Sequence, residues 1–114
     1  MYTYEITVPL LFQIVAQKDK HLITSRPINF VVDFTSQTLL TQEDVAQAEL
    51  ALKGKPIAAE TELIRCVQSI ATACLAQSQP MIEQFARLRP DAAKVSAAVV
   101  LDGHIRWHKK PPRH

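Results

Sequence analysis

Glycine is scarce in this sequence, with two in 114 residues. Phosphate-binding loops of the GxxxxGK[ST] and GxGxxG types need glycines so that the backbone can approach the phosphates, and neither pattern occurs. The patterns CxxC, HExxH and GxSxG, which mark thiol or zinc sites, zinc proteases and serine hydrolases, are also missing. We therefore expect a protein that is not an enzyme and that holds no cofactor and no metal ion.

Cysteine is equally scarce. Cys66 and Cys74 lie eight residues apart, which along one helix is a rise of about 12 Å, too far for a disulfide bond. We expect both thiols to be reduced, buried and unreactive, as is usual inside the cell. The N-terminal sequence MYTYEITV has no basic region followed by an apolar run, so no secretory signal is predicted. These features predict a cytoplasmic protein without a membrane segment.

Charge is distributed unevenly along the chain. Residues 1–62 carry five Lys/Arg against eight Asp/Glu, a net charge of −3, whereas residues 63–114 carry eight against three, a net charge of +5. No acidic residue follows Asp102, and the last eleven residues, HIRWHKKPPRH, hold four Lys/Arg and three histidines. A basic cluster of this kind is typical of a contact with phosphates or with an acidic protein surface.

The candidate contact residues come from this basic C-terminal segment. In the alternative interpretation the same segment is a solvated strand face followed by a flexible tail. Two of its histidines are four residues apart, about 13 Å along a strand, so they cannot share one metal ion. The candidate residues for a protein or nucleic-acid partner are His104, Arg106, Trp107, His108, Lys109, Lys110 and Arg113.

Alternation of apolar and polar residues predicts strands near the N-terminus. Residues 2–8 alternate with a period of two, and Pro9 then interrupts the pattern. Residues 10–16 form either a second strand or a bent extension of the first, and the proline favours an edge or a bulge. Residues 28–35 form the clearest strand of this part of the chain.

Three helices are predicted in the middle of the chain. Thr41 can cap the first, with Asp44 completing a capping box, and Lys53-Gly54 can end it. The second is expected over Pro56–Gln79, because apolar residues recur there at steps of three and four. Apolar side chains occupy more of the circumference of this helix than one sheet would cover. A short third helix begins at Pro80.

The C-terminal part of the chain predicts a β-hairpin. Residues 93–101 form one strand and residues 104–108 the return strand, because Asp102-Gly103 suits a type I′ turn. Pairing across such a turn would put four side chains on the core face of the sheet. These are Ala98, Val100, Ile105 and Trp107.

The expected fold is α+β. We expect an antiparallel sheet of about five strands, in the order strand-strand-strand-helix-helix-helix-strand-strand, with a long central helix and two shorter helices on one face. Residues 1–110 would form one domain and residues 111–114 a flexible basic tail.

The favoured function is a non-catalytic protein that binds other proteins, as an adaptor, inhibitor or assembly subunit, and that forms a homodimer or belongs to a larger assembly. The alternatives are a nucleic-acid-binding accessory protein that uses the basic C-terminal segment, and an enzyme with a site at a dimer interface. The candidate self-association residues lie on the long helix. They are Ile64, Cys66, Ala73 and Cys74.

Overall fold

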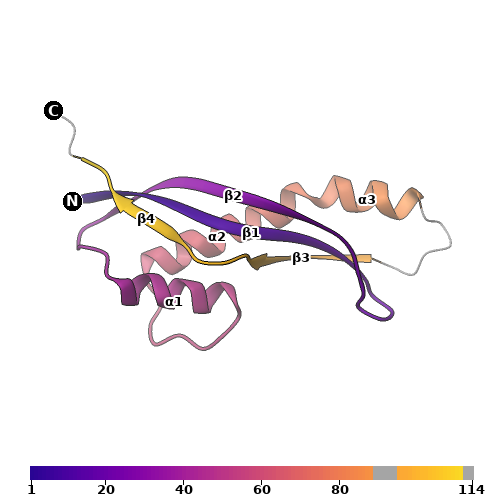
Figure 1. Cartoon of the computed structure of the whole chain (residues 1–114), viewed down its shortest axis with the longest axis horizontal. Helices are drawn as coiled ribbons and strands as arrows, with labels where there is room; N and C mark the ends of the chain where they lie inside the picture. The colour runs from indigo at the N-terminus through magenta and orange to yellow at the C-terminus, as the bar shows by residue number, and fades with distance from the viewer. Residues whose placement is uncertain (89–94, 112–114) are drawn as a thin grey trace.

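The computed structural model describes residues 1–88 and 95–111 of an elongated molecule of 58 × 32 × 18 Å. Its fold is α+β, with a four-stranded antiparallel sheet and helices on one face of it (Figure 1). This confirms the predicted fold class, with four strands in place of about five. The elements are β1 (Tyr2–Ala16), β2 (Leu22–Ser36), α1 (Gln42–Leu52), α2 (Glu62–Gln77), α3 (Gln79–Leu88), β3 (Val95–Leu101) and β4 (Arg106–Lys109).

The long strand β1 is the centre of the sheet. It pairs antiparallel with β2 along one side, and with β3 and then β4 along the other. The two strands considered for residues 2–8 and 10–16 are therefore one continuous strand. β1 is not an edge strand, because it has neighbours on both sides over most of its length, and its register shift lies at Ile14/Val15 and not at Pro9.

Pro9 fits into a central strand because the ladder has a gap beside it. Its carbonyl accepts a hydrogen bond from the Asp102 N–H at 2.9 Å, so its nitrogen also faces the β3/β4 side. Between Leu101 and Arg106 the chain leaves the ladder, and β1 has no strand partner at that point. The missing N–H of the proline therefore costs no ladder hydrogen bond.

The predicted C-terminal hairpin does not form. β3 and β4 run in the same direction and pair with successive parts of β1, not with each other (Figure 1). Gly103 keeps a positive φ of 106°, but the chain does not reverse there. A turn preference is local, whereas β4 gains a full ladder and an apolar contact by pairing with β1, and this tertiary gain decides the topology.

The predicted inward face is also wrong for β3. Val99 and Leu101 pack against the core, whereas Val100 is 38% exposed on the opposite face. The prediction of which β3 side chains face the core was based on the hairpin register, so it is wrong for the same reason as the hairpin. Ile105 and Trp107 do lie on the core side, as expected.

The helix α1 begins as predicted. The Thr41 side chain accepts a hydrogen bond from the Asp44 N–H, and the Asp44 carboxylate accepts one from the Thr41 N–H, which completes the capping box. After the helix, Gly54 takes a φ of +70°, a left-handed conformation that glycine adopts at little cost.

The helix α2 starts later than the expected Pro56. Thr61 is its N-cap and accepts a hydrogen bond from the Ile64 N–H. The preceding loop is held by α1, since the Ala58 N–H donates to the Gln47 side-chain oxygen at 3.0 Å. A backbone donor satisfied in this way does not need a helical partner.

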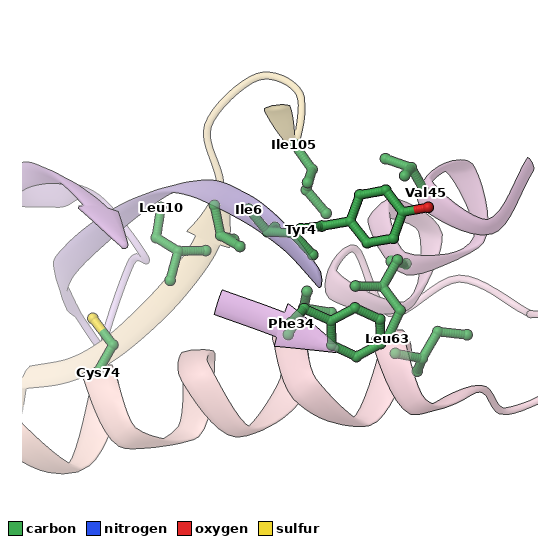
Figure 2. Close-up of a cluster of buried hydrophobic side chains, with 12 residues drawn as sticks. Tyr4, Ile6, Leu10, Phe34, Val45, Leu63, Cys74 and Ile105 are labelled. Atoms are coloured by element: carbon green, nitrogen blue, oxygen red, sulfur yellow. The ribbon is translucent and has the colours of Figure 1, made fainter. Parts of the chain in front are cut away.

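The core lies between β1 and the helices. Alternate residues of β1 are buried, and side chains from β1, β2, α1, α2 and the β3–β4 connection converge on one cluster (Figure 2). Only Ser78, itself buried, separates α2 from α3, and its hydroxyl donates to the Cys74 carbonyl. The helices thus form one layer, and the sheet face that points away from them is called the open face below.

Candidate interaction surfaces

The basic C-terminal segment lies along β1, so its side chains alternate between the two faces of the sheet. Arg106 and His108 are on the open face, whereas Trp107 and Lys109 are on the helix-covered face. The candidate residues therefore do not form one strip. Arg113 lies outside the described residues.

Acidic residues from the N-terminal half of the chain lie next to this segment. The Lys110 ammonium donates to both carboxylate oxygens of Asp33, at 3.1 and 3.2 Å, by reaching across β1. His108 Nε2 lies 3.9 Å from a carboxylate oxygen of Glu5. Folding thus brings acidic residues of the N-terminal half next to two residues of the basic C-terminal segment.

The aromatic residue of the segment is not a free stacking platform. The Trp107 ring is half-buried and packs edge-on against Tyr4, with ring centroids 5.8 Å apart. The neighbouring Lys109 places its ammonium 5.1 Å from the centre of the Tyr2 ring. The contact with Tyr4 thus fixes the Trp107 ring against the core and leaves it only partly exposed.

A carboxylate of α1 fixes the connection between β3 and β4. The Ile105 N–H donates to Glu49 at 2.8 Å, and the His104 ring nitrogen Nδ1 lies 3.2 and 3.3 Å from the two Glu49 oxygens. The Glu49 side chain is 14% exposed and the His104 side chain 84%. The backbone bond is therefore the sheltered part of this contact, and sequence reasoning missed it because the partners are 56 positions apart.

A hollow of about 720 Å³ opens near the two termini. The ion pair between Lys110 and Asp33 lies in its wall. Its other lining residues are Met1, Tyr2, Thr3, Thr35, Lys109 and Pro111.

The self-association residues expected on the long helix are divided between core and surface. Ile64 and Cys74 are buried within the chain's own core, Cys66 is half-buried, and Ala73 is exposed. The outer face of α2 carries mostly small or polar side chains between Arg65 and Ala76, with Leu75, 39% exposed, as a large apolar exception. In this conformation, buried Ile64 and Cys74 are not accessible to a second molecule.

Both cysteines are free thiols, as predicted. Burial raises the pKa of Cys66 and of Cys74 above the ordinary value of a thiol. The reactive thiolate is therefore disfavoured at both positions.

The open face of the sheet carries exposed apolar side chains. Val31 is 58% exposed, Leu22 52% and Val100 38%. They extend from β2 across to β3, so the apolar character is not confined to one strand. Sequence reasoning had located the surplus apolar surface on α2 instead.

The outer edge of β2 offers unpaired backbone groups. β2 pairs only with β1, and odd-numbered residues of β1 direct their backbone groups toward β3 and β4, as at Thr3 and Pro9. Their partners on β2 are also odd-numbered, and these direct their N–H and C=O groups outward. Within residues 1–88 and 95–111, no hydrogen bond satisfies the outward groups at Asn29, Val31 or Asp33.

One signal in the sequence points to this edge. Pro27 lies inside a strand pattern, and a proline in a strand is characteristic of an edge strand whose nitrogen faces solvent. Its register partner is Leu11, so the Pro27 nitrogen does face outward.

No known protein family, curated protein or solved structure matches this chain. Within the described part of the chain, no group of three His, Cys, Asp or Glu side chains is placed to hold a metal ion. None of the described helices is long and apolar enough to cross a membrane. A function can therefore be inferred only from the surfaces described above.

Proposed function

We propose that this protein is a non-catalytic binding protein, an adaptor, inhibitor or assembly subunit, that receives a strand of a protein partner on the outer edge of β2. The single observation that carries the proposal is the length of this edge. β2 has 15 residues and is paired on one side only. A long unpaired edge is a template for an added strand, which gains main-chain hydrogen bonds along its whole length.

The side chains of β2 define the chemistry of the partner. Ile28, Phe30 and Val32 face the helix layer, where they are only half-buried, and Val31 is exposed on the open face. An added strand with alternating apolar side chains would cover these groups. The partner is thus an extended protein segment, because backbone pairing supports affinity and alternate side chains support selectivity.

The opposite edge of the sheet is protected in a way that β2 is not. β3 and β4 have seven and four residues, and the chain leaves the ladder between them. Short strands and interruptions of the ladder are common devices that prevent strand addition. This contrast favours β2 as the edge that receives a partner.

The nucleic-acid alternative has weaker support. It relied on an accessible basic strip, but Lys110 is paired with Asp33 and Trp107 is packed against Tyr4. The enzyme alternative rests on a dimer interface that would have to assemble a site.

Capture from native cells tests the proposal with a matched pair of variants. Val31→Pro removes an outward N–H without removing a bond to β1, whereas Val31→Thr keeps the N–H and the β-branched shape. We expect tagged wild-type protein and Val31→Thr to retain the same protein partner, and Val31→Pro to lose it. Equal capture by all three proteins would exclude strand addition at this edge, provided that circular dichroism shows each variant folded.

A further inference from the structure

We infer that the strand added to β2 is β2 of a second copy of this chain, in an antiparallel dimer whose two-fold axis passes through Val31. This inference rests on the proposed function and names its partner. Two antiparallel copies of one strand are related by a two-fold axis perpendicular to the sheet. Both helix layers then lie on the same face of one continuous sheet.

The outward backbone groups permit this arrangement. Hydrogen-bonded pairs form between odd-numbered residues, so Val31 lies opposite Val31 of the second copy, and Asn29 lies opposite Asp33 of the second copy. Asn29 and Asp33 are both exposed on the open face, where the Asn29 amide can donate to the Asp33 carboxylate, which also accepts from Lys110 of its own chain. The two-fold axis generates this contact twice.

The helix-covered face is also self-complementary in this register. Ile28 lies opposite Phe34 of the second copy, and Phe30 lies opposite Val32 of the second copy. Each pair again occurs twice, and cross-strand pairs of aromatic and β-branched residues are among the more stabilising ones. The half-buried side chains of β2 would thereby gain the cover that the helices leave incomplete.

Neighbouring registers match less well. An axis through Asp33 would place two carboxylates opposite each other, and like charges in directly opposed positions are destabilising. An axis through Phe30 would place Arg26 opposite Phe34 of the second copy, and an axis through Val32 would place Ile28 opposite Ser36. The Val31 register instead pairs Arg26 with Ser36, so polar residues meet polar residues.

The edge of β2 is left to the second copy by the backbone pairing rather than by the helices. α1, α2 and α3 pack mainly against β1 and β3 and against one another, and α3 projects past the outer side of β2 in the view of Figure 1. Pro27 lacks the outward N–H and lies opposite Thr35 of the second copy. Pairing is therefore strongest over residues 28–34, which lie between Pro27 of one copy and the position opposite Pro27 of the other copy.

Cysteine cross-linking tests the register. In hydrogen-bonded antiparallel pairs the Cα atoms are about 5.5 Å apart, within the range that a disulfide spans. We expect Val31→Cys to give a reducible covalent dimer under mild oxidation. Thr35→Cys is the matched control, because two copies of residue 35 would be about 26 Å apart. Wild-type protein controls for the native cysteines.

Several outcomes would overturn the inference. Cross-linking of Thr35→Cys but not Val31→Cys would exclude the Val31 register. A mass near 12.8 kDa by light scattering at micromolar concentration would exclude the homodimer. If that monomer still captures a cellular partner that Val31→Pro loses, the strand-addition function stands and only the identity of the strand is wrong. A dimer that Val31→Pro leaves intact would show that the two copies meet elsewhere and would exclude this inference, whereas strand addition by another protein would still be decided by the capture experiment above.

Charge substitution provides a second measurement that needs no cross-link. Asn29→Asp would place a carboxylate opposite Asp33 of the second copy, and the two-fold axis would repeat this repulsion. We expect the dissociation constant of the dimer to rise roughly twofold to thirtyfold. Asn29→Lys would oppose an ammonium to the same carboxylate, and we expect tighter association. Equal dimer affinities for the two variants, measured by analytical ultracentrifugation, would contradict the contact between Asn29 and Asp33.

Discussion

The contact between Glu49 and the β3–β4 connection gives the sharpest stability prediction. The Glu49 carboxylate, 14% exposed, accepts the Ile105 N–H at 2.8 Å, and Ile105 is itself 5% exposed. A hydrogen bond to a charged group contributes about 1.5–3 kcal/mol, and a sheltered donor left without a partner is costly. We therefore expect Glu49→Ala to lower the free energy of unfolding by about 2 kcal/mol.

Thermal and urea unfolding measure this loss, with the fluorescence of the single tryptophan, Trp107, as a probe next to the contact. For a domain of this size the shift in melting temperature is about 8 °C. Glu49→Gln keeps an oxygen acceptor without the charge, so an intermediate loss is expected.

The control for this prediction is His104→Ala. The His104 side chain is 84% exposed, and exposed ion pairs contribute about 0–1 kcal/mol. A large loss for Glu49→Ala and a small one for His104→Ala would attribute the stabilisation to the backbone bond with Ile105. If the two variants lose equal stability, or if Glu49→Ala unfolds like wild type, the reasoning is refuted.

Two further predictions concern the thiols and the basic segment. Because burial raises the pKa of Cys66 and Cys74, alkylation of the native protein at pH 8 should be much slower than in denaturant; equal rates would contradict this. Wild-type protein and Arg106→Glu/Lys109→Glu should bind generic DNA equally weakly, since His108 and Lys110 already face Glu5 and Asp33; steeply salt-dependent binding that the double variant loses would instead favour the nucleic-acid alternative.

The helix starts and stops were readable because their signals are local. The capping box of Thr41 and Asp44 involves residues three positions apart, and it forms as expected. The start of α2 was misplaced because Pro56 is permissive for a helix start but does not require one. The N-cap that forms is Thr61, which accepts the Ile64 N–H, and Gln47 of α1 holds the loop before it through the Ala58 backbone.

The candidate interaction surface could be predicted only in part. Exposed apolar surface was expected on α2, because apolar residues occupy a wide part of its circumference. The sequence alone does not show which other elements cover that part of the helix. In the fold, Ile64 and Cys74 turn inward to the sheet. Leu75 of α2 is exposed, but Val31 and Val100 lie on a sheet face that no described helix covers.

The sequence by itself determined the fold class, the alternation of β1 and the capping box of α1, and the last two depend on residues close together in the chain. Only the tertiary structure decided that β3 and β4 both pair with β1. The Asp102-Gly103 turn signal is local and worth little against the ladder, the Trp107–Tyr4 contact and the Glu49 hydrogen bond that β4 and its connection gain.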